Sequence, residues 1–335
     1  MLTCRRDQRK GEAMPHFSKL VLLFCIFCIG LSSAAAQEKY PSRPIELVIP
    51  TPPGGGTDIS LRMLAEIVEP ILGQRVVVVN KPGGGGTVGM AEVVQARPDG
   101  YTIGGLWNAP LTMTPHVLPT PYKNTDYAAV TQVTASPVVM CVKAAFPASD
   151  GKGFIEELRK NPGKYTYGND GVGGTVQLAA ERVFTKLGVK ARAIPFAGAG
   201  ETLRAFLGGH VDIYGGSIPP IMPYVKDNSA KCLMVTSAER NASVPQAAGL
   251  ADLGASDEAT VLWRGIIAPR ALPADRLAVL QKAFAEAAQS ARFKEFMQKR
   301  GEEAKGSSSA EFRKLIDSEY DALGKVMAAI GLTKK

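Results

Sequence analysis

The sequence predicts an α/β protein of two lobes, each built around a doubly wound sheet. The chain has 335 residues, enough for two domains. Its first half alternates apolar, strand-like segments with amphipathic helical ones, and the same alternation starts again after Phe146 and Pro147. In each half a glycine-rich turn stands between a strand and a helix, at 54–56 and at 171–174. Two separate series of alternating strands and helices imply two sheets and therefore two lobes.

In the first half, strands that alternate with helices predict a parallel sheet. The expected strands are 45–49, 76–79 and 101–106, and the expected helices are 57–71 and 87–96. The first helix has one apolar face, which covers the sheet in this interpretation. This face consists of Leu61, Leu64, Ala65, Val68 and Ile71.

The second half repeats the pattern and then returns to the first lobe. The expected helices are 153–160, 175–187 and 200–207, and the expected strands are 164–168, 192–196, 211–214 and 231–237. Segment 263–269 is expected to be a return strand, and the amphipathic helices after it are expected to pack on the first lobe. We therefore expect lobe 1 to comprise 40–141 with 262–335, lobe 2 to comprise 142–261, and the crossovers to form a hinge.

The N-terminal region is typical of a secretory signal peptide. Basic residues precede a short apolar run, 20–31, and Ala36 ends a stretch of small residues. This run is too short to span a bilayer. We expect export to the periplasm with cleavage after Ala36. Met14 is an alternative start, and a lipid anchor at Cys25 or Cys28 is disfavoured by the bulky residues before them.

Charge and cysteine usage exclude several classes of function. The formal charge is +8, and loss of residues 1–36, with five basic and two acidic side chains, leaves +5. The lysine and arginine residues are scattered along the chain, so no nucleic-acid partner is expected.

Two cysteines, Cys141 and Cys232, remain after cleavage and lie in apolar segments. This placement favours buried thiols over metal ligands, and a disulfide between them is a further possibility. His116 and His210 are too isolated to indicate catalysis, and we predict no metal and no cofactor.

The loop 54–58 has the composition of an anion site. It connects an apolar strand to a helix, so its N–H groups and the helix N-terminus are expected to point at the same space. A carboxylate or phosphate fits such a place without a side-chain cation. A plain turn with Thr57 or Asp58 as the N-cap is the alternative.

Several motifs in a fixed order resemble one known family over essentially the whole mature chain. The chain is similar to the solute receptors of tripartite tricarboxylate transporters, the TctC or Bug family. The matching segments are Tyr40-Pro41-Ser42-Arg43-Pro44-Ile45, Pro52-Pro53-Gly54-Gly55-Gly56-Thr57-Asp58, Asn80-Lys81-Pro82-Gly83, Pro98-Asp99-Gly100-Tyr101-Thr102, Asn161-Pro162-Gly163-Lys164 and Gly208-Gly209-His210-Val211-Asp212.

The resemblance implies a type II-like Venus-flytrap protein of the periplasm without enzymatic activity. Such a protein captures a small carboxylate-bearing or amino-acid-like solute between its lobes and delivers it, as a monomer, to membrane permease subunits. The family's ligand loops fall on Gly54, Gly55, Gly56, Thr57, Asp58, Trp107, Asn108, Gly171, Gly173, Gly174 and Thr175. One carboxylate would then bind the first loop and a second the helix that begins near Thr175. Asp58 either caps its helix, which we favour, or accepts a hydrogen bond from the ligand.

The sequence differs from the family pattern at positions that would determine ligand specificity. Thr51 replaces a usual aromatic, and Gln177 replaces a common histidine. Trp107 either stacks on a flat ligand such as an aromatic acid or covers the sheet. Tyr214 is expected at the cleft edge. Arg264 is either a carboxylate ligand or a solvent-facing arginine, and we favour the second interpretation.

Two other functions compete with transport. A sensory receptor would bind the same solute and present the closed lobes to a membrane kinase. A phosphate-handling enzyme is disfavoured, because no nucleophile is paired with a base and no Walker lysine follows the glycine turns.

Overall fold

The computed structural model describes residues 39–329 and 331. The chain divides into an N-terminal unit, Met1–Ser42, and a compact unit, Arg43–Lys335, which contains all the helices and strands described below. The expected signal peptide, residues 1–36, lies outside the described residues.

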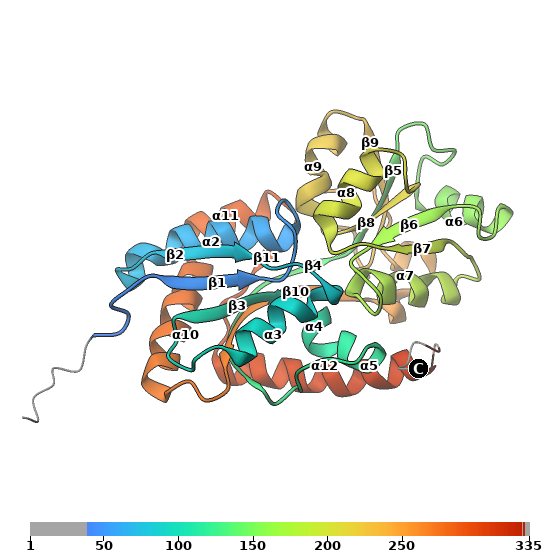
Figure 1. Cartoon of the computed structure of the whole chain (residues 1–335). Helices are drawn as coiled ribbons and strands as arrows, with labels where there is room; N and C mark the ends of the chain where they lie inside the picture. Colours follow the sequence, from blue (N-terminus) through green and yellow to red (C-terminus); the bar gives the residue numbers. More distant parts are fainter. Residues whose placement is uncertain (1–38, 330, 332–335) are drawn as a thin grey trace, which may run out of the picture. The chain divides into compact units, whose positions relative to one another are not determined.

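The first sheet has six strands in the order β11-β4-β10-β3-β1-β2 (Figure 1). Their bounds are β1 Ile45–Ile49, β2 Val76–Asn80, β3 Thr102–Trp107, β4 Tyr127–Pro137, β10 Val261–Pro269 and β11 Glu303–Ala304. The expected parallel arrangement is confirmed for β1, β2 and β3. The expected return strand is β10, and it is antiparallel to both β3 and β4. The sheet is mixed because the chain leaves it along β4 and returns along β10, so that Val261 pairs with Pro137.

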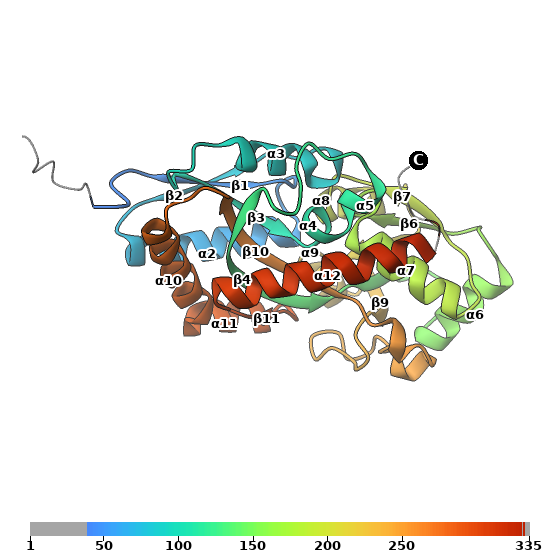
Figure 2. The same cartoon turned by 90° about the horizontal axis from the view of Figure 1, so that it is seen from below.

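Helices cover both faces of this sheet. They are α2 Gly56–Leu72, α3 Thr87–Gln95, α4 Ala109–Thr112, α5 Thr114–Val117, α10 Ala274–Gln289, α11 Ala291–Gln298 and α12 Ser309–Ala329. The expected apolar face of α2 is buried at Leu61, Leu64 and Val68, but Ile71 is exposed because it lies in the last turn. Figure 2 shows α12 running along β4 and α4, and its Phe312 and Ile316 join the core around Trp263.

The second sheet has five strands in the order β7-β6-β8-β5-β9. Their bounds are β5 Val139–Lys143, β6 Thr166–Asn169, β7 Arg192–Pro195, β8 Ile213–Gly216 and β9 Ala230–Val235. Strand β6 is parallel to β7 and β8, whereas β5 is antiparallel to β8 and β9. The four helices are α6 Gly151–Lys160, α7 Thr175–Lys186, α8 Ala199–Leu207 and α9 Ile218–Lys226.

Alternate residues of β5 face two different cores, one on each face of this sheet. Met140 packs with Phe154 of α6 and Val183 of α7. Cys141 packs on the other face with Phe206 of α8 and Ile221 of α9. We call the first sheet with its helices the first lobe, and the second sheet with α6 to α9 the second lobe.

A disulfide joins Cys141 to Cys232 across paired strands β5 and β9. Both cysteines are fully buried. The disulfide that the sequence left open is therefore formed, because the antiparallel register places the two residues directly opposite each other. Residue spacing along the chain does not reveal this register.

The two connections between the sheets are hydrogen-bonded to each other through Thr236. One connection is Val138 and the other is segment 236–260. The Thr236 hydroxyl accepts from the N–H of Val138 at 2.9 Å and donates to the carbonyl of Thr260 at 2.9 Å. The N–H of Thr236 donates back to Val138, and the N–H of Thr260 donates to Thr236.

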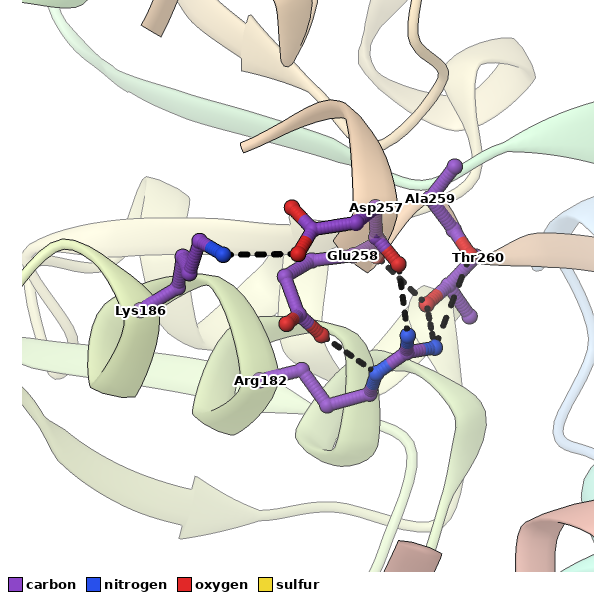
Figure 3. A network of polar contacts seen from close by, with 6 residues as sticks. All are labelled: Arg182, Lys186, Asp257, Glu258, Ala259 and Thr260. Atoms are coloured by element: carbon purple, nitrogen blue, oxygen red, sulfur yellow. Dashed lines mark hydrogen bonds and ion pairs between the residues drawn. The ribbon is translucent and has the colours of Figure 1, made fainter. Parts of the chain in front are cut away.

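Helix α7 is attached to the segment that leads into β10, as Figure 3 shows. Arg182 pairs with Glu258 at 2.9 Å and donates to the Thr260 hydroxyl at 3.2 Å. Lys186 pairs with Asp257 at 2.6 Å. These contacts hold the return connection against the second lobe up to the residue before β10.

Candidate functional site

Loops from both lobes meet around one small cavity at the carboxyl ends of the strands. Its volume is about 20 Å³, the space of about one water molecule. Ligands of open α/β sheets bind outside the carboxyl ends of the strands. The lining residues are Thr51, Gly55, Gly56, Thr57, Trp107, Asp170, Val176, Gly198, Ala199, Gly216, Ser217, Leu262 and Arg264.

Three helices begin at this cavity without a side-chain cap. Helix α2 starts after Gly55, α8 after Gly198 and α9 after Ser217. Within the described part of the chain, no group accepts a hydrogen bond from the N–H of Gly56 or of Ala199. Unpaired N–H groups and positive helix ends attract an anion. The cavity is therefore electropositive at the loops from which these helices start.

Gly56 allows the two lobes to approach each other here. A Cβ atom at Gly56 would lie less than 3.0 Å from Ser217 Oγ and from Arg264 Nη2. Ser217 comes from the second lobe, and Arg264 comes from β10 in the first. Any side chain at position 56 would thus occupy the space that these two polar groups share.

Arg264 is the one cationic side chain among the cavity-lining residues, and it is 1% exposed. Its Nη1 pairs with Glu302 at 2.6 Å and donates to the Thr134 hydroxyl at 3.2 Å, and its Nε donates to the Thr57 hydroxyl at 3.2 Å. No acceptor for Nη2 is found in residues 39–329 and 331. The favoured sequence interpretation, a solvent-facing arginine, is wrong because β10 lies in the interior of the sheet, between β3 and β4.

Two hydroxyl groups in the cavity lining are buried without partners. Within the described residues, neither Thr51 Oγ1 nor Ser217 Oγ has a hydrogen-bond partner. Thr51 is 5% exposed and Ser217 is 1% exposed. Buried polar groups are normally satisfied, so these two hydroxyls indicate a place where a polar ligand group completes the network.

The second glycine loop has its N–H groups bonded within its own lobe. The N–H of Gly171 donates to Asn169 Oδ1 at 2.9 Å, and the N–H of Gly173 donates to Gln177 Oε1 at 2.8 Å. The N–H of Gly174 donates to the carbonyl of Gly171. In this structure, Gly171, Gly173, Gly174 and Gln177 thus shape the loop and do not line the cavity.

Asp170 occupies the N-terminus of α7, where a second ligand carboxylate was expected from the sequence. It accepts from the N–H of Thr175 at 3.0 Å and from the N–H of Val176 at 2.9 Å. Burial raises the pKa of the Asp170 carboxyl, while the N–H of Val176 is the largest of the donors that oppose this rise.

Trp107 and Asn108 connect the lobes. Trp107 Nε1 donates to Asp170 Oδ2 at 2.9 Å, and Thr175 Oγ1 donates to Asn108 Oδ1 at 2.7 Å. Asn108 also donates to Glu319 of α12 at 3.0 Å. The Trp107–Asp170 and Thr175–Asn108 bonds are buried, and they link the end of β3 directly to the start of α7.

Asp58 and Tyr214 lie behind the cavity lining. Asp58 accepts from the N–H of Gly54 at 3.0 Å, from Arg62 at 2.8 Å and from Asn80 at 2.9 Å, so it stabilises the first loop. Tyr214 donates to the carbonyl of Ser217 at 2.9 Å and thereby positions the start of α9. Burial raises the pKa of the Tyr214 hydroxyl.

Sequence reasoning missed Glu302 and Asp170. It also had no local signal for the contacts of Ser217 with Gly56 and of Ala199 with Gly55, because the register of short strands decides which turns face the cavity. Glu302 lies next to β11, a strand of two residues. An available signal for Asp170 was an aspartate in an Asn-Asp-Gly turn just before a helix.

Comparisons with known proteins agree on one family. The model of the tripartite tricarboxylate transporter family receptor matches residues 60–332. A UPF0065 protein of Bordetella pertussis is 30% identical over 320 residues, covering 95% of this chain and 99% of its own. The periplasmic binding protein BugD is 27% identical with a TM-score of 0.82, covering 88% of this chain and 100% of its own. An R. palustris protein solved with adipate is 25% identical with a TM-score of 0.84, with coverage of 88% and 100%.

The fold of two mixed sheets around a donor-lined cavity defines a solute-binding receptor of the periplasmic binding protein class, not an enzyme. The chain belongs to the tripartite tricarboxylate transporter receptor family, TctC. In the described residues, no helix is both long and apolar enough to cross a membrane.

Proposed function

We propose that the protein captures a small carboxylate-bearing metabolite between its lobes and delivers it to a tripartite tricarboxylate-type permease in the membrane. The single observation that supports this best is the convergence of three uncapped helix N-termini and the buried Arg264 guanidinium on one cavity. This arrangement attracts an anion, and among the described residues of the lining no nucleophile is paired with a base. The family supports delivery to a permease, and the related structure with adipate supports a carboxylate ligand.

The site that we propose extends the residues expected from the sequence. Thr51, Gly55, Gly56 and Thr57 contact the ligand from the first lobe, and Trp107 covers it. The other residues expected at the site support these contacts from behind: Asp58, Asn108, Gly171, Gly173, Gly174, Thr175, Gln177 and Tyr214. Several charge-assisted hydrogen bonds in a closed cleft are sufficient for micromolar binding, which corresponds to about 8 kcal/mol.

Ligand entry requires the lobes to separate. The cavity of about 20 Å³ is far smaller than the roughly 300–1,000 Å³ of ordinary ligand sites. We propose that the first lobe ends at residue 137 and resumes at 261, and that the second lobe comprises 139–260, because β5 and β10 each belong whole to one sheet and the expected boundaries at 141 and 262 would divide them. The lobes rotate about Val138 and Thr236, where the two connections are bonded together. A rotation there opens the cavity without breaking either sheet.

The proposed function also implies that the protein is located in the periplasm. A receptor for a membrane permease works outside the cytoplasm, after export and cleavage behind Ala36. The buried Cys141–Cys232 disulfide supports this location, because such bonds form and persist in oxidising compartments. We propose that the mature receptor acts as a monomer.

A thermal-shift screen of small organic acids tests the proposal. The purified mature protein is heated with mono-, di- and tricarboxylates and, for comparison, with uncharged amides of the same acids. We expect at least one acid to raise the melting temperature and its amide to have no effect, because binding to the folded state stabilises it. Equal shifts with acid and amide, or no shift with any acid, would contradict carboxylate capture.

A further inference from the structure

We infer that the ligand carries a single carboxylate, which binds at Arg264 and leaves an apolar body over Trp107. The ligand class is thus a monocarboxylic acid with an aliphatic or aromatic body, and not a diacid. This inference rests on the proposed function, because it specifies the solute that the receptor captures.

The available donors of the cavity lie together at one end. Arg264 Nη2 and Ser217 Oγ both lie next to Gly56. The N–H of Gly200, in the first turn of α8, lies 3.3 Å from the Cβ position of Gly55, and Thr51 lies 3.5 Å from that of Gly198. The unpaired hydroxyl groups, the helix starts and the guanidinium therefore surround one anionic group. Glu302 holds the guanidinium in place by its 2.6 Å bond to Nη1.

Around Asp170, the described residues of the cavity lining offer no comparable set of donors. There Asp170 already binds the N–H groups of Thr175 and Val176, and the N–H groups of Gly171, Gly173 and Gly174 are bonded as well. All of these acceptors belong to the second lobe, so separation of the lobes does not release the donors.

Asp170 also disfavours a second acid at this end. It lines the cavity, and it accepts from Trp107 Nε1 in addition to the two backbone N–H groups. A second ligand carboxylate would lie beside this carboxyl group, and two like charges at short distance repel each other. Nothing on the described part of this end offers a cation to offset that repulsion.

The remaining walls suit an apolar body. Trp107 is the cross-strand partner of Arg264, so the two side chains lie on the same face of the sheet. Its indole N–H is bonded to Asp170, and the outer edge of its six-membered ring lies against Gly86. The part of the ring that lines the cavity is therefore what the ligand contacts. Leu262 and Val176 complete this wall. An acid anchored at Arg264 thus places its carbon skeleton against apolar surface.

Calorimetric titration of the mature protein with matched acids tests the inference. The pairs are hexanoate with adipate and benzoate with terephthalate, each differing by one carboxylate. We expect the better-fitting monoacid to bind at least ten times more tightly than its diacid. Equal or tighter binding of the diacid would overturn the inference and leave the proposed function intact. If no acid in the wider screen bound, the proposed function itself would fail.

A double variant tests the anchor. Arg264→Gln with Glu302→Gln removes the buried ion pair without leaving one charge unpaired, and we expect monoacid affinity to fall at least thirtyfold. The matched control is Arg292→Gln with Glu66→Gln, which removes an exposed arginine–glutamate pair that neither lines the cavity nor contacts the connections between the sheets and should leave affinity unchanged. Circular dichroism checks that both variants fold. Unchanged affinity in a folded Arg264 variant would overturn the assignment of the anchor.

Discussion

At the scale of single residues, the buried pair of Arg264 and Glu302 is the most unusual feature of the site. Both side chains are 1% exposed or less. Burying two charges costs several kcal/mol for each ion, and their attraction offsets this only with good geometry and further hydrogen bonds. Thr57, Thr134 and Ser60 provide those bonds. A pair of this kind contributes little net stability, so a role in holding the guanidinium at the cavity explains it better than a role in folding.

Gly56 gives the first prediction. In Gly56→Val, the new side chain would overlap Ser217 Oγ and Arg264 Nη2. We expect the variant to fold, because Ser217 belongs to the other lobe and can move away with it, but to lose the thermal stabilisation by ligand. Gly153→Val is the control, because a Cβ atom there has ordinary contacts of 3.4 Å or more. Full stabilisation of Gly56→Val by the ligand would show that the loop does not bind it.

Glu319 gives a prediction on pH. Burial raises the pKa of its carboxyl above 4.5, against hydrogen bonds from Trp263, Asn108 and Thr112. The folded protein therefore holds this proton more tightly than the unfolded chain, so this group's contribution to stability increases as the pH falls from the raised pKa toward 4.5. Relative to Glu319→Gln, the wild type should gain unfolding free energy over that range in urea titrations.

The control for this prediction is Glu311 on the same helix. Its pKa is lowered, first by the Ser308 backbone N–H and then by the Ser308 hydroxyl. A lowered pKa has the opposite effect on stability. The contribution of Glu311 to the free energy of unfolding is present above its pKa in the unfolded chain and is lost as the pH falls. Relative to Glu311→Gln, the wild type should thus lose unfolding free energy in acid. The same direction for both glutamates would contradict the assignment of the Glu319 shift to burial.

At the scale of elements, each helix of the site begins where its strand ends, and only some of these starts are capped from within. The cap residues of α2, α7 and α8 are all glycines, but in α7 the Asp170 carboxylate binds the N–H groups of the first turn. A glycine supplies no acceptor, so the first-turn N–H groups stay available for a ligand. The difference between capped and uncapped helix starts therefore decides which loops bind an anion.

The disulfide between β5 and β9 gives a prediction on stability. Its cysteines are 91 positions apart, and closing a long loop restricts the unfolded chain. The double substitution of Cys141 and Cys232 by alanine should lower the free energy of unfolding by about 2–4 kcal/mol. Urea titration measures this, and reductant should destabilise the wild type but not the variant. A reductant effect of equal size on both proteins would contradict the assignment.

At the scale of the whole receptor unit, Arg43–Lys335, two buried hydrogen bonds oppose separation of the lobes. One joins Trp107 to Asp170 and the other joins Thr175 to Asn108. A hydrogen bond to a charged group contributes about 1.5–3 kcal/mol. The closed arrangement therefore has stabilising contacts that do not depend on a ligand, and these contacts set how readily the receptor opens.

Trp107→Phe tests this balance. The variant keeps an aromatic ring but loses the Nε1 donor, so we expect the ligand-free protein to populate the open form more. Small-angle X-ray scattering should show a larger radius of gyration than for the wild type, and ligand should reverse the increase. Trp263→Phe is the matched control, because its indole donor is bonded to Glu319 within the first lobe. Identical scattering of Trp107→Phe and the wild type would exclude this role.

Local patterns were sufficient to predict much of this protein. Strand–helix alternation predicted β1, α2, β2 and α3 nearly to the residue, because apolar periodicity and glycine turns are local signals. The same patterns did not predict α9, which has Pro219 and Pro220 in its first turn, nor the antiparallel strands around β10. The resemblance to the receptor family, which the comparisons confirm, rests on motif order along the chain.

Tertiary structure alone decided which side chains meet at the site. Arg264 is buried because β10 lies between two strands that are far from it in sequence. Ser217 lies beside Gly56 because the chain crosses between the sheets twice. A sequence determines local propensities and the number of donors in each loop. The position of a donor, and whether another group of the protein already binds it, depends on packing between distant segments.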